Sequence, residues 1–192
     1  MKKVVHVKSK LPKAAKTVFE KFQKAGFEIY LVGGAVRSLL IGKEIHDCDF
    51  TTNAKPKEIQ KLFPENFYDN LFGTVRVAFK KETYEITTYR TERGYADRRH
   101  PDKVFWGKTL EEDLKRRDFT INTIVIGPRK DGEFEFIDLF EGEKDLKRKI
   151  IRTVGNAQER FDEDSLRMMR AIRIATQLGF VIENKTFQAI KK

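Results

Sequence analysis

The sequence predicts an α/β fold, of the α+β kind, in which an antiparallel or mixed sheet is followed by helices. Three observations support this prediction. Helix-like and strand-like periods alternate through the first 150 residues. Two alternating segments joined by a short polar turn predict a β-hairpin, which requires antiparallel pairing. From Phe161 onward the pattern is helical throughout. We therefore expect an α/β domain over residues 1–150 and the beginning of a helical domain over residues 151–192.

Helices and strands alternate in the first half of the chain. The expected helices are residues 11–27, 34–42 and 55–63. The expected strands are residues 28–33, 47–52, 73–79 and 83–90. Gly26 and Gly42 end the first two helices, and Pro56 stands in the first turn of the third, where its missing amide proton costs little. The last two strands form the hairpin.

The second half begins with a polar segment rich in charge, residues 91–108, which we expect to be a long loop. Loops of this length are usually functional or disordered. Residues 109–127 then predict a helix, a turn and a strand. Further strands are expected at residues 133–140 and 149–155, on either side of a helix at residues 141–149.

The composition indicates a protein that associates with a polyanion. The chain has 192 residues with a formal net charge of +10, and such an excess favours nucleic acid as a partner. Residues 1–24 carry eight lysines and one glutamate on an amphipathic, helix-like stretch, although a solvated face explains that run equally well. The single cysteine, Cys48, fits a reducing compartment. No membrane span or signal peptide is recognisable, so we expect a cytoplasmic protein.

Two aspartates, Asp47 and Asp49, are two residues apart in "HDCDF". On a strand their side chains would share one face, with Cys48 and Phe50 pointing into the core. Carboxylates so placed repel one another unless a cation lies between them, and Mg²⁺ prefers such oxygen ligands. The alternative is a pair of exposed aspartates on an edge strand.

A third carboxylate, Glu85, lies between Tyr84 and Ile86 in "YEITTY". If those two neighbours are buried, Glu85 points to the opposite face of its strand. Were that strand next to the one that carries Asp49, three carboxylates could converge and hold two Mg²⁺ ions for phosphoryl or nucleotidyl transfer. A solvent-facing glutamate on a half-buried strand is the alternative.

A strand running into Gly33 and Gly34 and then into a helix exposes backbone amides, to which phosphate binds well. Arg37 is one turn further and could reach the same phosphate. The segment is neither a Walker A loop nor a dinucleotide fingerprint, because the lysine and the further glycines are absent. A close-packed turn explains the glycines alone equally well.

Two further segments place arginines beside aspartate. "RRDFTIN" has Arg116, Arg117 and Asp118 at the end of an expected helix. In "DEDSLRMMRAIRIA" the charged residues are spaced by three along an expected helix, and each step turns by about −60°, so Asp164 and Arg167 would be neighbours. That helix would be largely buried, and buried arginines need anionic partners or a ligand. The charged residues concerned are Asp164, Arg167, Arg170 and Arg173.

Together these motifs resemble a known family. "LVGGAVR", "HDCDFTT", "YEITTYRTE", "RRDFTIN" and "ERFDEDSLRMMRAIRIATQLGF" occur in this order in class II tRNA nucleotidyltransferases, the CCA-adding enzymes. These enzymes and their poly(A) polymerase relatives belong to the polymerase-β-like nucleotidyltransferases. The resemblance runs from about residue 27 to the last residue. It implies a catalytic head domain over residues 1–150 and the start of a helical neck over residues 151–192.

The resemblance also implies roles for the site residues. Asp47 and Asp49 would bind catalytic Mg²⁺, and Glu85 would be the third carboxylate. Asp164 and Arg167 would read the base of CTP or ATP, with Arg170 and Arg173 in the same pocket. The residues expected to bind nucleotide are Gly33, Gly34, Arg37, Arg117, Asn122, Asp164, Arg167, Arg170 and Arg173.

The implied reaction is addition of CMP and AMP from CTP and ATP to the 3′ end of tRNA by a two-metal mechanism. Segment 91–105 resembles the family's flexible loop, which is needed for the switch to AMP addition. Ser38 departs from the family's pattern, because an aspartate usually follows the arginine, and this change would weaken nucleotide handling. The chain is also shorter than family members, so we expect a fragment that lacks the tRNA-gripping domains.

Several alternatives remain open on the sequence. Within the same class these are A-adding, CC-adding and poly(A)-adding enzymes. The loop argues against a CC-only enzyme, and the short segment 70–79 argues against a bacterial poly(A) polymerase. An alternative from a different functional class is a non-catalytic head domain that only binds RNA. The paired aspartates argue against it, because such a module has no use for metal ligands. The oligomeric state is open.

Overall fold

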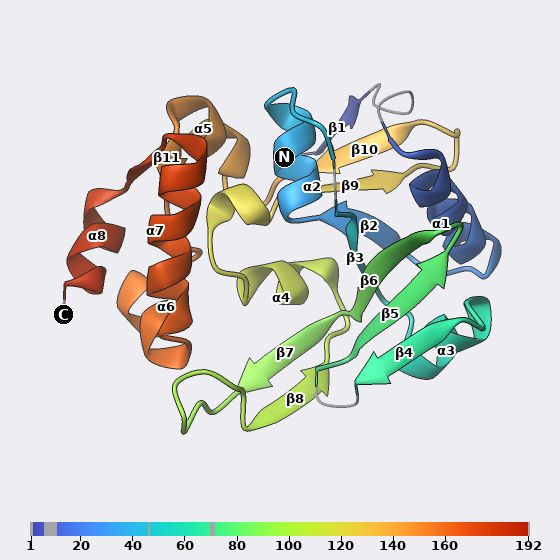
Figure 1. Ribbon diagram of the computed structural model, residues 1–192, viewed down its shortest axis with the longest axis horizontal. Coiled ribbons are helices and arrows are strands. Elements are labelled where there is room, and N and C mark those ends of the chain that lie inside the picture. Colours follow the sequence, from blue (N-terminus) through green and yellow to red (C-terminus); the bar gives the residue numbers. More distant parts are fainter. Residues whose placement is uncertain (1, 6–10, 46, 70–71, 192) are drawn as a thin grey trace.

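The computed structural model describes residues 2–5, 11–45, 47–69 and 72–191 and is built around a mixed eight-stranded sheet (Figure 1). Its strands are β1 (Lys2–Val5), β2 (Ile29–Val32), β3 (Asp49–Thr52), β4 (Asn66–Asp69), β5 (Thr74–Phe79), β6 (Glu82–Thr88), β9 (Val125–Pro128) and β10 (Phe134–Ile137). Their spatial order is β1-β10-β9-β2-β3-β6-β5-β4. Neighbours are antiparallel except β3 and β6, which are parallel. The predicted fold class is confirmed.

The predicted hairpin is formed by β5 and β6, and its turn is the pair Lys80 and Lys81. Both residues have positive φ, 52° and 66°. Two successive left-handed residues give the turn a backbone twist that matches the right-handed twist of the flanking strands. The turn therefore fixes the register in which the two strands pair.

Helices that connect successive strands cover one face of the sheet. They are α1 (Lys13–Lys24), α2 (Gly34–Leu40) and α3 (Pro56–Leu62). Phe19 of α1 packs edge-on against Phe50 of β3 and Phe134 of β10, with ring centroids 5.3 Å apart in each pair. These rings belong to the largest apolar core, which contains most of the inward-facing strand residues. An aromatic core thus holds the sheet against α1.

The opposite face of the sheet is covered in part by α4 (Leu110–Lys115), whose Leu114 is buried against Val32, Val125 and Ile137. A 3₁₀ turn, η2 (Thr120–Asn122), follows α4. Its Ile121 and the neighbouring Phe119 join a separate core with the C-terminal helices, which Figure 1 shows on the left. Those helices are α5 (Gly142–Arg148), α6 (Ala157–Glu163), α7 (Leu166–Leu178) and α8 (Asn184–Ile190).

Three sequence expectations are wrong in part. The segment 91–108 is mostly a hairpin of β7 (Arg90–Arg93) and β8 (Lys103–Trp106), because its alternating residues pair antiparallel. The region after Phe161 is not all helix, since β12 (Val181–Ile182) pairs in parallel with β11 (Ile150–Ile151). Residues 2–5 of the basic N-terminal stretch form a strand that pairs with β10, whereas a helix-like stretch was expected.

Helix α7 is buried on one face only, not largely buried as predicted. Ala171, Ile174 and Ala175 point into the helical core, while Met169 is 65% exposed. The exposed face also carries Arg170. In the described part of the chain, no helix is both long and apolar enough to cross a membrane.

Gly142 at the start of α5 allows a close approach of two backbone segments. A Cβ atom at this position would lie 2.2 Å from the carbonyl oxygen of Thr120. We expect Gly142→Ala to lower the free energy of unfolding by about 1–3 kcal/mol, because the backbone must shift to relieve the overlap. Urea denaturation measures this effect, with Arg148→Ala, an exposed change in the same helix, as control. Equal midpoints for the two variants would contradict the close approach.

Candidate active site

The carboxylates Asp49 and Glu85 lie side by side on adjacent strands. The parallel register of β3 and β6 pairs these two residues, so their side chains share one face of the sheet. Tyr84 and Ile86 are buried on the other face, as predicted. Strand β3 begins at Asp49, so it is shorter than the predicted strand and Asp47 lies just before it. Strand β6 is thus the neighbour of β3 that a convergent carboxylate site requires.

Electrostatic repulsion acts on this carboxylate group. The pKa of Asp49 is raised, first because protein atoms displace water around it and then because Glu85 and Asp47 are negatively charged. Arg117 acts in the opposite direction. Glu85 is itself paired with Arg76, Oε1 to Nη2 2.7 Å, at a half-exposed position. A divalent cation would relieve the repulsion, and the residues present therefore fit one.

The number of ligands also bears on that fit. In the described parts of the chain, no three Asp, Glu, His or Cys side chains come close enough to form a metal site by themselves. Mg²⁺ commonly uses only one or two carboxylates and completes its coordination with water and substrate phosphates. Asp47 and Asp49 agree with that kind of site.

Gly33 and helix α2 bring a basic group close to the carboxylates. Gly33 has φ 74° and caps the helix, and a Cβ atom there would lie 3.8 Å from Oδ2 of Asp49. Arg37 of α2 donates a hydrogen bond to Oδ1 of Asn122. Its pKa is lowered by burial, and the positive charges of Arg170 and Arg173 act in the same direction, although Asp118 opposes them.

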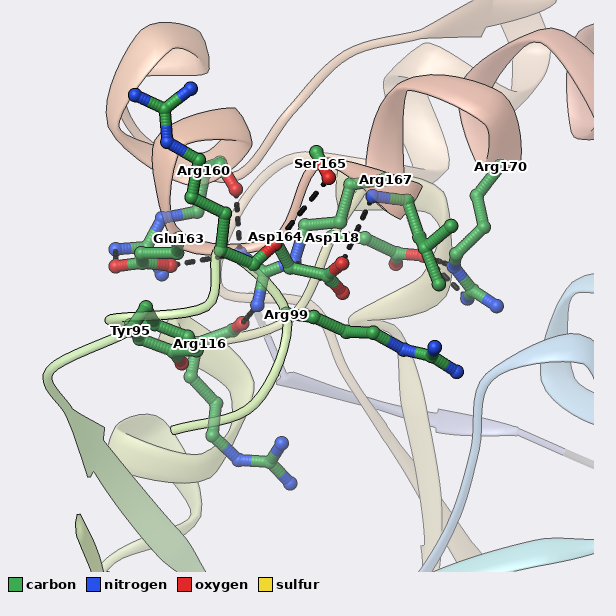
Figure 2. Close-up of polar contacts among 12 residues, drawn as sticks. Tyr95, Arg99, Arg116, Asp118, Arg160, Glu163, Asp164, Ser165, Arg167 and Arg170 are labelled. Atoms are coloured by element: carbon green, nitrogen blue, oxygen red, sulfur yellow. Dashed lines mark hydrogen bonds and ion pairs between the residues drawn. The ribbon is translucent and has the colours of Figure 1, made fainter. Parts of the chain in front are cut away.

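Asp118 is a buried centre of hydrogen bonding between the sheet and α7. It accepts two hydrogen bonds from Arg170, Nη2 to Oδ2 2.6 Å and Nε to Oδ2 2.9 Å (Figure 2). It also accepts one from Asn122, Nδ2 to Oδ1 3.0 Å. Burial alone would raise its pKa, but the charge of Arg170 and these hydrogen bonds hold the pKa below its usual value. Through Asn122 the same network reaches Arg37, so α2 and α7 are linked across one carboxylate.

A second buried carboxylate, Asp113, orients the arginine pair of "RRDFTIN". It accepts hydrogen bonds from Arg116, Nη2 to Oδ1 2.7 Å, and from Arg117, Nη2 to Oδ2 3.0 Å. The hydroxyl of Thr51 on β3 donates to it as well, over 3.0 Å. Although burial acts to raise the pKa of Asp113, the two arginines lower it to about 2. Asp113 was not among the predicted site residues, although it lies three and four residues before the two arginines.

Arg167 is buried at the start of α7, and its principal partner is Glu163. The distance from Nη1 to Oε2 of Glu163 is 2.9 Å, whereas Nε lies 3.8 Å from Oδ2 of Asp164 (Figure 2). Arg167 also donates to the carbonyl oxygen of Arg116 over 3.2 Å. Asp164 is thus held only loosely by the arginine with which the sequence paired it.

A cavity of about 340 Å³ lies between α7, the end of α4 and the segment after β7. Six arginines line it, together with Glu92, Asp118, Asp164 and other residues. Four of the predicted nucleotide-binding residues are among its walls, namely Arg117, Asp164, Arg167 and Arg170. The other predicted site residues lie outside the walls of this cavity: Gly33, Gly34, Arg37, Asp47, Asp49, Glu85, Asn122 and Arg173. A larger cavity, of about 580 Å³ beside α6 and α8, contains no predicted residue.

The segment between β7 and β8 closes one side of the smaller cavity. The carbonyl oxygen of Arg98 accepts a hydrogen bond from the amide of Ser165, over 3.0 Å, directly beside Asp164. Tyr95 donates to Glu92 over 2.7 Å, and Glu92 also accepts from Arg90 and Arg116. The contacts of Ser165 with Arg98 and of Arg116 with Glu92 were not foreseen, because they join residues far apart in the sequence.

Comparison with known proteins gives consistent results. The family described as the poly(A) polymerase head domain matches residues 29–152. A CCA-adding enzyme of Lactobacillus delbrueckii subsp. bulgaricus is 52% identical over 177 residues, which are 92% of this chain and 44% of that enzyme. The chain therefore spans less than half the length of this relative.

Two solved structures are similar to the whole arrangement. The CCA-adding enzyme of Bacillus stearothermophilus in complex with CTP has a TM-score of 0.81 and 42% identity, over 93% of this chain and 42% of that one. The CCA-adding enzyme of Thermotoga maritima complexed with tRNA has a TM-score of 0.80 and 26% identity, over 100% of this chain and 45% of that one.

Proposed function

This chain belongs to the poly(A) polymerase head domain family, and from that premise we propose that it carries the catalytic site of a template-independent tRNA nucleotidyltransferase. The reaction is the addition of CMP and AMP, from CTP and ATP, to the 3′ end of tRNA. The observation that carries the proposal is a carboxylate site beside a cavity lined with arginines, with Arg117 acting on Asp49 and also lining the cavity.

In this proposal Asp47, Asp49 and Glu85 are the catalytic carboxylates, and the first two hold Mg²⁺. A metal ion held by these residues would lower the pKa of the attacking 3′-hydroxyl and neutralise charge on the leaving pyrophosphate. The repulsion that raises the pKa of Asp49 supports this assignment. The nucleotidyltransferase head domain family is, in general, dependent on a divalent metal.

The arginines hold the triphosphate. Arg37 and Arg117 each have a buried Nε atom without an acceptor in the described part of the chain. Buried N–H groups are normally paired, and the oxygens of an anionic ligand would supply acceptors for these donors. Arg170, Arg173 and Asn122 add to this group, and the backbone at Gly33 and Gly34 leaves room for a phosphate. The same residues would release pyrophosphate after the bond at the α-phosphate has formed.

Asp164 and Arg167 read the base. Asp164 offers acceptors and Arg167 offers donors, and the buried position of Arg167 fixes its direction. Since Arg167 is held by Glu163, Asp164 keeps one carboxylate oxygen for a ligand, while the other accepts from the amide of Leu166 over 3.0 Å. Selection of a nucleotide by the protein requires polar groups that can still form hydrogen bonds to the base.

Arg167→Ala is expected to reduce discrimination between CTP or ATP and the other nucleotides by about 10- to 100-fold in kcat/KM, because a charged hydrogen bond to the base is lost. Competition between CTP and UTP in single-nucleotide addition measures this ratio. Arg148→Ala, an exposed arginine with no role in the site, is the control. Retention of full discrimination by the Arg167 variant would assign base reading to other residues.

We also propose a division of the chain into two domains and a cellular location. Residues 1–150 form the catalytic head and residues 151–192 the beginning of a helical neck. The buried, unpaired Cys48 supports a cytoplasmic location.

The test of the function is extension of tRNAs that end before CCA, after the first C and after CC, with CTP, ATP or both and Mg²⁺. The expected result is stepwise growth, which the double change Asp47→Ala and Asp49→Ala abolishes. The set of extended ends distinguishes CCA addition from CC-only or A-only addition. If the protein shows no growth and no Mg²⁺-dependent CTP binding, the catalytic proposal is refuted. A head domain that only binds RNA is then favoured.

A further inference from the structure

One row of side chains crosses seven strands of the sheet on the face that carries the carboxylates. The strand registers pair each residue with the next one. Because paired residues on adjacent strands point to the same face, the whole row lies on one side of the sheet. In spatial order the row is Ile137, Val125, Val32, Asp49, Glu85, Arg76 and Phe67.

The two halves of this row differ in accessibility. Val32, Val125 and Ile137 are at most 1% exposed and are packed beneath Leu114 of α4. From Asp49 to β4 the row is open to solvent. A polymer whose end lies at Asp49 therefore has one direction along the row that the described residues leave accessible, and this direction leads toward β4.

Phe67 stands at the far end of the open half. It is 67% exposed, the highest value for any phenylalanine in the described residues. Its neighbour along β4, Tyr68, packs against the core on the opposite face, so Phe67 is not turned outward by a local irregularity. A single exposed apolar residue is ordinary on a protein surface. Its position in line with two carboxylates and an arginine is what requires an explanation.

Distances fit a nucleic acid strand. Adjacent strands are about 4.8 Å apart, so the Cα atom of Phe67 lies about 14 Å from that of Asp49, within reach of the last few nucleotides. Aromatic side chains bind single strands by stacking on bases, and nearby basic groups bind the phosphates. Arg76 lies between the phenyl ring and the carboxylates, with more than half of its side chain exposed.

Building on the proposed function, we propose that Phe67 and Arg76 bind the single-stranded 3′ end of the RNA acceptor. A base two or more nucleotides from the reacting hydroxyl stacks on Phe67, and Arg76 contacts the intervening phosphate. The incoming nucleotide enters from the opposite side, through the cavity beside α7. Figure 1 shows β4 at the lower right, away from α6 and α7 on the left. The two substrates thus approach the carboxylates from different sides.

The test compares Phe67→Ala with wild type in RNA extension and in equilibrium binding of a short single-stranded RNA labelled with 2-aminopurine near its 3′ end. We expect the KM for RNA and the dissociation constant each to rise about tenfold, while the KM for CTP is unchanged. Phe67→Trp should restore both values, because any large ring can stack. Phe187→Ala, which removes an exposed phenylalanine of α8, is the matched control and should change neither.

The outcomes separate this inference from the proposed function. If wild type binds the RNA with a contribution from Phe67 but neither extends it nor binds CTP in the presence of Mg²⁺, the catalytic proposal fails and the RNA surface stands. If wild type extends RNA and Phe67→Ala leaves both RNA constants unchanged, the inference is overturned. Sedimentation in which wild type self-associates and Phe67→Ala is monomeric, with RNA constants unaltered, would instead assign β4 to contact between copies of this chain.

Discussion

Asp49→Asn is expected to reduce nucleotidyl transfer by about a thousandfold or more, since a charged ligand at a catalytic metal contributes several kcal/mol to stabilising the transition state. The substitution keeps the shape of the side chain and removes only its charge. Rates of single-nucleotide addition at saturating CTP and Mg²⁺ measure the effect. Glu111→Gln, at an exposed position of α4, is the control for loss of one acidic charge.

The same substitution should not destabilise the fold. The pKa of Asp49 is raised in the folded protein, so folding favours the protonated, neutral form. At neutral pH the ionised side chain therefore opposes folding, and a neutral asparagine removes that opposition. We expect the urea midpoint of Asp49→Asn to equal or exceed that of wild type. A clearly lower midpoint would contradict the raised pKa of Asp49. A rate within tenfold of wild type would contradict a catalytic role for this carboxylate.

Asp113→Ala is expected to lower the free energy of unfolding by about 3–5 kcal/mol, because it leaves Arg116 and Arg117 without the buried carboxylate that holds both. Asp113→Asn should cost less, since an amide still accepts one hydrogen bond. Urea denaturation at pH 7 measures both variants. Glu111→Ala in the same helix is the control, and a loss no greater than that of the control would show that the network contributes little.

The contribution of Asp113 to stability should also depend on pH in the acid range. The pKa of Asp113 is about 2 in the folded protein and about 3.9 in an unfolded chain. Its ionised form therefore stabilises the fold fully above about pH 4, and this contribution is lost as the pH falls toward 2. Between these values the stability of wild type should fall more steeply than that of Asp113→Asn. Parallel curves for the two proteins would contradict the lowered pKa.

The elements that the sequence predicted correctly are those with local causes. Gly26 and Gly42 end helices through positive φ, and Lys80 with Lys81 form a turn between two alternating strands. Strand β4 was missed because the four residues "NFYD" carry too little alternation to indicate a strand. Its existence depends on pairing with β5, which no local pattern records.

The site was predicted less completely than the fold. The sequence identified Asp49 and Glu85 as candidates, and the parallel register of β3 and β6 places these two residues opposite each other. Arg167 was assigned to Asp164 on the assumption of one continuous helix. The chain instead breaks at Asp164, which has extended φ and ψ of −143° and 101° and ends α6, so Glu163 becomes the partner. Asp113 and Glu92 were passed over because burial, not residue type, makes a carboxylate important.

The pairing of β1 with β10 also constrains the order in which the molecule assembles on the ribosome. Lys2 is synthesised well before its partner Ile137, because many other elements of the sheet lie between them in the sequence. At 5–20 residues per second this interval is on the order of ten seconds. During that time the first strand has no sheet edge to join, while the β5–β6 hairpin can already form. Strand β1 is therefore one of the last strands to join the sheet, although it is synthesised before the strand with which it pairs.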